Sequence, residues 1–460
     1  VGGFVSMFSM ISATLVASTQ RFLTYELGKQ KNNSSQTVFS VAMTIHVLLG
    51  VILLLLFETI GLWFLNERMN IDASRLHAAN WVYQCSILSF LLNVIRSPFE
   101  ASIIAHEKMS AFAYVNIFEA LLRLGIVFLL LLTIKDRLIL YSVYVVCISI
   151  LIFVIYVIYC KSRFEEIRFK FINEKSYYKD IVSFAGYNFL GSVSMVLSRQ
   201  CVNVISNIYF GVVVNAARGI TTQVEAAINK FVNDFSVALN PQITKSYAQG
   251  NKSNMMNLIY RGAKFSYFLY LFFAVPIIVK TPIILQLWLK IVPDHSIVFV
   301  RLALVDSLIT TLSYSISTGA MATGNIKKLS IWIGIIRICV FPVTYFAYEL
   351  GFEPYSAFVV LIIFDVILFF VRLIISDNLI GVQHKPFIYR VILPISVVSI
   401  ISFSFAFFLN KILVVSNLFQ LLLFVVISCI ITIIAISLIG FDALEREFVV
   451  GYIKKIVGKK

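Results

Sequence analysis

Apolar residues occur along the whole chain in runs of helix length, separated by short polar connections. About 20 apolar residues form a helix that crosses the hydrocarbon core of a bilayer. The runs do not alternate with polar positions, which excludes an outer-membrane barrel. We therefore expect an all-α polytopic membrane protein. The pattern predicts thirteen spans, near residues 1–20, 38–63, 77–97, 109–133, 138–160, 181–207, 211–238, 258–286, 297–322, 328–349, 355–376, 389–410 and 417–440.

Composition supports this fold class and limits the candidate chemistry. The chain is 60% hydrophobic and 13% charged, whereas soluble domains average about 45–50% and about 25%. No polar stretch is long enough for a separate soluble domain. The six cysteines lie in or at the ends of apolar segments, and the five histidines are scattered. We expect no metal site and no cofactor, because neither residue type has metal-ligand spacing.

Lysine and arginine are distributed unevenly between the two sets of connections that lie on opposite sides of the predicted membrane. Every second connection, together with the C-terminal tail, holds 25 of them, and the other set holds nine. The positive-inside rule places the richer set and the C-terminus in the cytoplasm, and Val1 outside. A cytoplasmic N-terminus then requires one further helix upstream, so we expect fourteen helices with the first missing. The net charge of +15 indicates contact with anionic membrane lipids and this topology, not nucleic acid.

Two polar segments border the spans. Residues 441–460 place apolar side chains on one side and lysines at the end, which predicts an amphipathic helix lying on the inner leaflet. Residues 161–180 mix phenylalanine and isoleucine with charges. This segment is either a second interfacial helix or an ordinary solvated loop.

The predicted span 211–238 is too polar to face lipid on all sides. It carries Arg218, Glu225, Lys230 and Asp234, and each charge at a bilayer centre costs about 2.5–3.5 kcal/mol. A helical wheel gathers the polar residues within roughly one quarter of the circle: Asn215, Arg218, Thr222, Glu225, Asn229 and Asn233. This face is expected to line a cavity or a pathway.

The preceding span, 181–207, has a polar face of its own. The residues that share it lie within roughly 60° of one another on the wheel: Asn188, Ser192, Arg199, Asn203 and Ser206. The two spans follow one another directly, so we expect a hairpin with both polar faces towards the same interior.

A possible duplication links the two halves of the chain. Gln20 to Gly28 and Gln242 to Gly250 have the same length, and each is followed by an apolar helix that ends in Leu-Trp. Chance similarity in a biased sequence is the alternative. A true repeat implies an N-terminal lobe (1–160) and a C-terminal lobe (181–376), joined by a cytoplasmic linker (161–180), with an appended helix pair (377–440) and the tail (441–460).

Four segments resemble polysaccharide flippases of the O-antigen (Wzx) type, in the multidrug/oligosaccharidyl-lipid/polysaccharide exporter superfamily: SATLVASTQRFLTYELGK (12–29), AARGI (216–220), FVNDFSVALNPQITKSYAQGN (231–251) and ATGN (322–325). The resemblance implies a MATE-like fold of two six-helix lobes in the bacterial inner membrane. It also implies that the cargo is an undecaprenyl-diphosphate-linked oligosaccharide for surface polysaccharide. A polysaccharide polymerase is a candidate partner, and a monomer is expected.

Such a cargo suggests roles for the polar residues. A diphosphate favours fixed cations, and arginine binds it through two parallel N–H groups. The diphosphate candidates are Arg199, Arg218 and Lys230. The candidates for sugar or water contacts are Asn188, Asn203, Asn215 and Asn229. Structural ion pairs of Arg218 with Glu225 and of Lys230 with Asp234 are the alternative.

Acidic residues within apolar helices are candidates for binding a coupling proton or cation. The four candidates are Glu225, Asp234, Asp306 and Asp365. Arg337 is a partner for either Asp306 or Asp365, and the sequence leaves this choice open. Glu119 and Arg123, four residues apart, favour a structural pair.

The sequence thus favours a flippase that works by alternating access and is not an enzyme. A cation-coupled multidrug exporter is the second hypothesis, and Arg199 and Arg218 argue against its acidic cavity. A membrane polymerase or glycosyltransferase is the third. It requires a long catalytic loop with paired acids or metal ligands, and the connections here are short.

Overall fold

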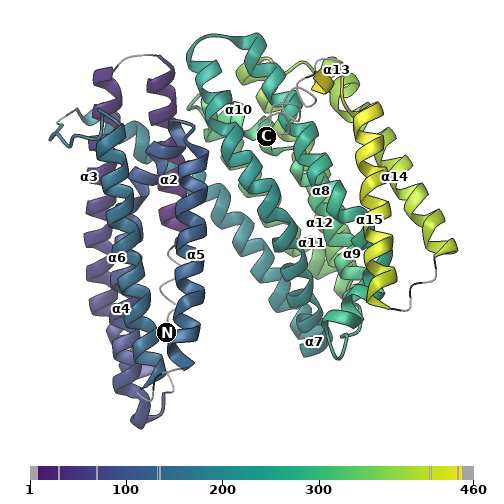
Figure 1. Ribbon diagram of the computed structural model, residues 1–460, viewed down its shortest axis with the longest axis horizontal. Coiled ribbons are helices and arrows are strands. Elements are labelled where there is room, and N and C mark those ends of the chain that lie inside the picture. The colour runs from purple at the N-terminus through teal and green to yellow at the C-terminus, as the bar shows by residue number, and fades with distance from the viewer. Residues whose placement is uncertain are drawn as a thin grey trace, which may run out of the picture. The chain divides into compact units, whose positions relative to one another are not determined.

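The computed structural model describes the whole chain except residues 1–8, 30–31, 69–70, 132, 134–135, 173, 414, 416, 443–444 and 448–460. Every regular element among the described residues is helical, which confirms the predicted fold class (Figure 1). The chain forms two compact units. Unit 1 comprises residues 1–192, 244–251 and 324–327, and unit 2 comprises residues 193–243, 252–323 and 328–460.

Unit 1 is a bundle built around a central helix, α4. Its helices are α2 (Ser9–Gly28), α3 (Asn32–Leu56), α4 (Leu76–Ala105), α5 (Met109–Leu131), α6 (Arg137–Arg163) and the first part of α7 (Lys175–Ala248). Helix α4 packs against α6, α2 and α3. Phe39, Phe99 and Tyr156 are among the large side chains of this core.

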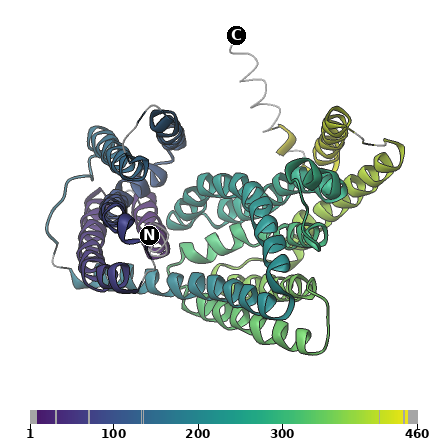
Figure 2. The ribbon, with the colours of Figure 1, turned by 90° about the horizontal axis from the view of Figure 1, so that it is seen from below.

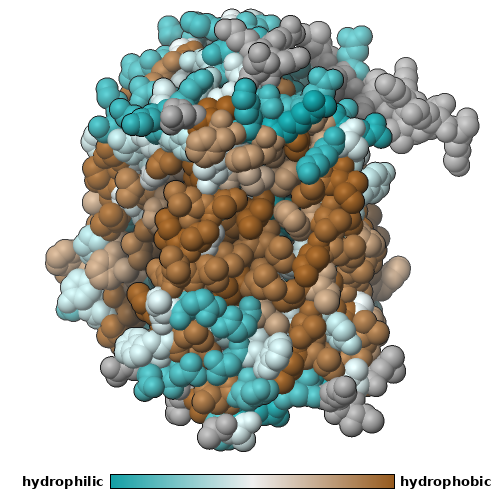
Figure 3. All heavy atoms as spheres, turned by 90° about the vertical axis from the view of Figure 1, so that its left-hand side faces the viewer, coloured by the Kyte–Doolittle hydropathy of each residue, from teal (hydrophilic) through white to brown (hydrophobic). Residues whose placement is uncertain are grey.

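The outer surface of unit 1 is banded. Figure 3 shows a broad hydrophobic zone with hydrophilic side chains at both ends. Helix α5 of unit 1 likewise exposes apolar side chains, among them Leu121, Phe128 and Leu131. Apolar side chains exposed in a continuous band are stable in lipid and unfavourable in water.

Unit 2 contains the rest of α7 and the helices that follow it. These are α8 (Lys252–Trp288), α9 (Ser296–Thr311), α10 (Tyr314–Ala322), α11 (Lys327–Glu349), α12 (Ser356–Ile380), α13 (His384–Phe387), α14 (Leu393–Ile412) and α15 (Leu418–Ala435). Helix α8 contacts α9, α10, α14 and α15. Helices α14 and α15 lie side by side on α8 (Figures 1 and 2).

The start of the C-terminal tail is held against α8 by a buried charge cluster. Glu445 accepts a hydrogen bond from Lys264 Nζ at 2.5 Å and lies 3.6 Å from Arg261 Nε. Both Lys264 and Glu445 are buried. The predicted amphipathic helix over residues 441–460 falls mostly outside the described residues.

The predicted spans after the first coincide with helices. Among the described residues, eleven helices are long and apolar enough to cross a membrane. Helix α7 is counted once there, although its two arms cover the predicted spans 181–207 and 211–238. The predicted first span, 1–20, overlaps α2 from Ser9 onward. The span predicted over 297–322 is confirmed as one candidate span, Ser296–Ala322, with a short break inside it, because α9 ends at Thr311 and α10 begins at Tyr314.

The two ends of the proposed repeat touch within unit 1. Tyr25 and Tyr247 occupy the same position in the two repeats, and their ring centroids lie 6.2 Å apart. A methyl group on Gly28 would lie 2.8 Å from Cβ of Ala248. This close approach requires glycine. The duplication itself stays a prediction from the sequence.

Candidate functional site

The candidate site lies on the hairpin formed by α7 in unit 2. Gly211 interrupts the helix with φ 76° and ψ −166°, a conformation that is essentially restricted to glycine. The chain therefore reverses direction at this point. Arg199 and Asn203 precede the break, and Arg218 and Glu225 follow it. This arrangement brings together the polar faces of the two predicted spans.

Arg218 is the most buried cation of this hairpin. Its Nε donates a hydrogen bond to Oδ1 of Asn203 at 2.6 Å. Its guanidinium carbon lies 5.0 Å from the centroid of the Phe358 ring. Nη1 is buried and has no hydrogen-bond partner among the described residues. A buried guanidinium with an unused donor is costly unless a ligand or water supplies the acceptor.

A polar cavity of about 490 Å³ lies beside Arg218, and we call it the Arg218 pocket. Its lining residues are Gln200, Asn203, Val204, Asn207, Ile208, Asn215, Arg218, Gly219 and Thr222. Four of them carry side-chain amides. The pocket thus combines one cation with several groups that donate and accept hydrogen bonds, and its volume is within the range of small-molecule sites.

Arg199 lies outside this lining and pairs with an acid instead. Its Nη2 donates to Oε1 of Glu225 at 3.2 Å. Oε1 of Glu225 also accepts a hydrogen bond from Ser307 Oγ at 3.3 Å. The pairing therefore crosses the hairpin from Arg199 to Glu225. It differs from the Arg218–Glu225 pair considered from the sequence.

A second charge cluster connects α9, α11 and α12. Arg337 forms two hydrogen bonds with Asp365, one of them at 3.1 Å from Nη1 to Oδ2, so Asp365 is its partner. Both side chains are 3% exposed. Asp306 lies buried on α9, which packs against α12, and its Oδ1 has no hydrogen-bond partner among the described residues.

The other candidates lie apart from the Arg218 pocket. Lys230 Nζ donates to Oδ1 of Asp234 at 2.7 Å, and these side chains are 72% and 55% exposed. This is the ion pair considered from the sequence. Asn229 has a buried Oδ1 with no partner in the described part of the chain and does not line the pocket. Asn188 belongs to unit 1, where its carbonyl accepts a hydrogen bond from Ser192.

Gln200 and Asn207 line the pocket but were not among the sequence candidates. They lie three residues before and four residues after Asn203, so the three share one helical face. That spacing is visible in the sequence. The predicted face, which includes Arg199, leaves Gln200 and Asn207 just outside it.

Unit 1 has a charge cluster of its own. Arg123 Nη2 donates to Oε1 of Glu119 at 2.8 Å, as the four-residue spacing predicted. Arg96 Nη1 donates to the other carboxylate oxygen at 3.2 Å. Glu119 thus neutralises two arginines, which supports a structural role for the cluster.

The fold and this site define a class: a multi-pass helical membrane protein with a polar, cation-containing pocket in one of its two units. No family model and no curated protein matches the chain. Solved structures match its fold. One, described as a mutant form of MATE, aligns with 14% identity and a TM-score of 0.73 over 84% of this chain and 88% of that one.

Two further solved structures have the same fold. A multidrug resistance MATE family transporter of the MOP superfamily, in an outward-facing conformation, aligns with 13% identity and a TM-score of 0.74 over 82% of this chain and 87% of that one. A MOP superfamily transporter from Pyrococcus furiosus aligns with 13% identity and a TM-score of 0.70 over 81% and 85%. It is described as having a binding pocket of reverse polarity that suggests a different function. The chain therefore has the MATE-like fold, as expected.

Proposed function

We propose that this protein is a transporter that flips an undecaprenyl-diphosphate-linked oligosaccharide across the bacterial inner membrane. The observation that carries the proposal is Arg218. Its guanidinium is buried, one nitrogen has no partner among the described residues, and it borders a pocket rich in amides. A diphosphate supplies the missing acceptor, and sugar hydroxyls suit the amides of Asn203 and Asn215.

The three candidate cations differ in how available they are to a diphosphate. Arg199 is paired with Glu225, and Lys230 is paired with Asp234. Arg218 instead bonds to the neutral side chain of Asn203. A diphosphate would have to compete with a carboxylate for Arg199 or Lys230. We therefore assign Arg218 the principal role and the other two secondary ones.

Coupling to a proton or cation is the second part of the proposal. Of the four acidic candidates, Glu225 and Asp234 are held by cations. Asp365 is held by Arg337 in the same way, whereas one buried oxygen of Asp306 has no hydrogen-bond partner in the described chain. We therefore assign the coupling ion principally to Asp306 and give Asp365 a secondary role.

A cation-coupled multidrug exporter is the alternative function. The buried carboxyl groups of Asp306 and Asp365 favour it, because an acidic interior suits cationic compounds. The fold is equally suited to either function, since one of the matching structures is described as a multidrug resistance transporter. The charge at the Arg218 pocket favours the flippase.

Reconstituted full-length protein tests the assignment. Flipping of a fluorescent short-chain polyprenyl-diphosphate disaccharide is measured in proteoliposomes by quenching from outside. We expect Arg218→Gln to slow flipping about ten-fold or more, because it removes charge-assisted hydrogen bonds. Arg218→Lys keeps the charge but lacks the planar guanidinium. Its flipping rate should lie between those of the wild-type protein and Arg218→Gln. Arg199→Gln and Lys230→Gln should have smaller effects in that order, and Arg123→Gln is the control.

Two results would overturn the proposal. Unchanged flipping in Arg218→Gln, at equal protein per vesicle, removes the diphosphate role of Arg218. Transport of cationic dyes by the wild-type protein, without any flipping of the diphosphate probe, reverses the ranking in favour of the drug exporter.

A further inference from the structure

A second polar cavity lies in unit 1, at the end where α6 finishes. Its volume is about 730 Å³, and we call it the loop pocket. Its lining residues are Phe39, Met43, Phe99, Lys161, Ser162, Arg163, Phe164, Glu165, Ile167, Arg168 and Phe169. They come from α3, α4, the last turn of α6 and the connection that follows it. The proposed transport function uses none of them.

The connection over residues 164–172 is not helical, so it is not an interfacial helix. Its backbone is held by side chains of α3. Gln36 Nε2 donates to the carbonyl oxygen of Arg168 at 2.9 Å, and Lys170 N–H donates to Ser40 Oγ at 3.1 Å. These bonds satisfy backbone groups that would otherwise favour a helix or water. The connection is therefore a loop that is held by α3 as one wall of the pocket, while Arg168 and Phe169 remain exposed.

The start of the connection is held by His106, which follows α4. The Phe164 ring stacks on the His106 ring with centroids 4.0 Å apart, and His106 forms a hydrogen bond with Glu166. Burial raises the pKa of Glu166, but the hydrogen bonds and charge around it outweigh burial and hold the pKa below its usual value. The carboxylate of Glu166 is thus held by His106, and Glu166 is not among the residues that line the pocket.

The rim of the pocket is cationic. Lys161, Arg163 and Arg168 are all exposed, and Glu165 is the one acid among the lining residues. The floor is apolar, because Phe39 and Phe99 are buried and pack edge to face with centroids 5.4 Å apart. A cationic rim over an apolar floor suits an anionic amphiphile better than a soluble anion.

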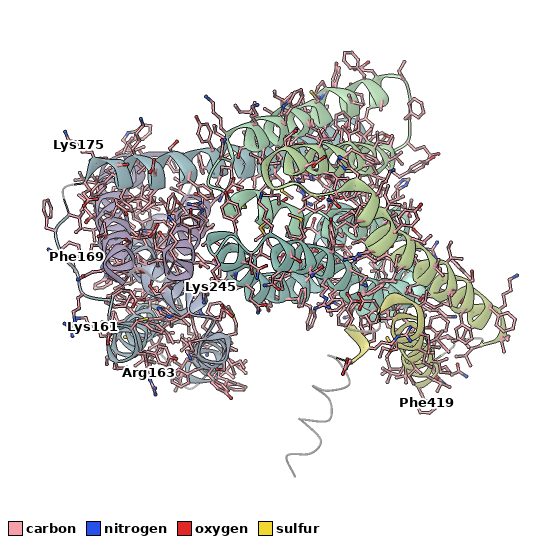
Figure 4. The ribbon with its side chains drawn as sticks, turned by 90° about the horizontal axis from the view of Figure 1, so that it is seen from above. Lys161, Arg163, Phe169, Lys175, Lys245 and Phe419 are labelled. Atoms are coloured by element: carbon pink, nitrogen blue, oxygen red, sulfur yellow. The ribbon has the colours of Figure 1, made fainter. Side chains whose placement is uncertain are left out.

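Two phenylalanines extend the apolar surface outward from the connection. The side chain of Phe169 is 58% exposed and that of Phe171 is 76% exposed. Figure 4 shows the connection along the outer edge of unit 1, with Phe169 between Lys161 and Lys175. Exposed aromatic rings among basic side chains are typical of the membrane interface, where rings enter the acyl region and cations meet headgroups.

We propose that the loop pocket binds an anionic phospholipid from the adjacent leaflet. Lys161, Arg163 and Arg168 hold its phosphate and headgroup. One acyl chain passes over Phe169 towards Phe39 and Phe99. The ligand class follows from the three cations and the apolar floor, and it is independent of the transported cargo.

Native mass spectrometry of the full-length protein in detergent tests this site. The protein is titrated with phosphatidylglycerol, with zwitterionic phosphatidylcholine and with inorganic phosphate. We expect one phosphatidylglycerol to bind at least about ten-fold more tightly than phosphatidylcholine. The variant Lys161→Ala/Arg163→Ala/Arg168→Ala should lose this preference. The matched variant Lys252→Ala/Lys327→Ala/Lys328→Ala removes three exposed lysines from other connections and should keep it.

A conservative variant separates loss of charge from loss of folding. Arg163→Lys/Arg168→Lys preserves the charges and should retain most of the binding. Equal affinity for both lipids, or an unchanged preference in the triple alanine variant, would overturn the proposal. Displacement of the lipid by millimolar inorganic phosphate would show a soluble-anion site and would also overturn it.

The position of the acyl chain has its own test. In Phe169→Trp, brominated phosphatidylglycerol should quench the added fluorescence, measured as the difference from the wild-type protein with its four tryptophans. Quenching should fall when the three cations are replaced by alanine. A tryptophan at position 169 that is not quenched by the brominated lipid would contradict the proposed path.

Discussion

Two ion pairs of unit 2 differ in burial, and this difference sets their contributions to stability. The side chains of Arg337 and Asp365 are each 3% exposed. Those of Lys230 and Asp234 are 72% and 55% exposed. Removing one partner of a buried pair leaves an uncompensated charge, at a cost of about 3–5 kcal/mol. An exposed pair contributes about 0–1 kcal/mol.

We therefore expect Asp365→Asn to lower the free energy of unfolding by about 3 kcal/mol or more. Asp234→Asn, the matched exposed variant, should change it by less than about 1 kcal/mol. Unfolding in mixed micelles of dodecyl maltoside and sodium dodecyl sulfate measures both. The double variant Arg337→Met/Asp365→Leu should recover much of the loss, because neither charge is left alone. Equal effects of the two single variants would mean that water reaches Arg337.

At the level of single residues, the sequence identified part of the Arg218 pocket. Arg218, Asn203 and Asn215 were predicted from the helical wheel. Arg199 does not line the pocket, because the lining residues of this arm are centred near Asn207, roughly 80° from Arg199 on the wheel. A wheel gives relative angles within one helix only. Which side meets the neighbouring helix depends on packing, as the cross-hairpin pair of Arg199 with Glu225 illustrates.

Among the elements, α7 depends most directly on one backbone conformation. Gly211 has φ 76° and ψ −166°, and this region costs other residues about 1–3 kcal/mol. An added Cβ would meet no atom within 4 Å, so the cost is conformational rather than steric. The hairpin that positions Arg218 opposite Asn203 therefore requires glycine at its turn.

We expect Gly211→Ala to destabilise the protein by about 1–3 kcal/mol and to weaken binding at the Arg218 pocket. Gly191→Ala is the control, because Gly191 lies on the same helix and its Cβ also meets nothing within 4 Å. Alanine in a helix interior should be neutral or stabilising by up to about 1 kcal/mol. The same micelle unfolding assay compares the two. Equal stability of both variants would show that the turn tolerates a side chain.

The sequence predicted the existence of the helices better than their interruptions. The break between α9 and α10 falls in a stretch rich in serine and threonine. There Thr311 Oγ1 donates to the carbonyl oxygen of Leu308 at 2.7 Å, and Thr310 Oγ1 donates to that of Asp306 at 3.0 Å. Such side chains compete for backbone groups and loosen a helix. Hydropathy does not reflect this competition, so the sequence predicts one span, which the structure contains as Ser296–Ala322, but not the break inside it.

At the scale of the whole molecule, the pattern of apolar segments predicts the fold but little of how the helices pack. Solved structures with only 13–14% identity share this fold over more than 80% of the chain. Many different apolar side chains are stable in contact with lipid, so many sequences can form the same membrane-spanning helices. The division into units was less accessible. The boundary falls at Ser192, within α7, because residues before it, such as Phe184, pack on α2. Hydropathy does not predict such packing.

Lysine and arginine carry the remaining information at this scale, which is the orientation of the chain in the membrane. The connections that follow α6 and α10 belong to the basic set, and those that follow α8 and α11 belong to the other. The bias predicts that the basic set lies in the cytoplasm. Fusions test this, because green fluorescent protein matures in the cytoplasm and alkaline phosphatase is active outside it.

We expect fluorescence from fusions after Asn251 and Asn325, and phosphatase activity from fusions after Pro293 and Glu353. The pair at Asn325 and Glu353 is the sharpest comparison, since the two sites are separated by α11 alone. The reversed pattern at both pairs would place the basic connections outside and contradict the assigned topology. The same fusions decide which leaflet supplies the lipid of the loop pocket, because Lys161, Arg163 and Arg168 belong to the basic set.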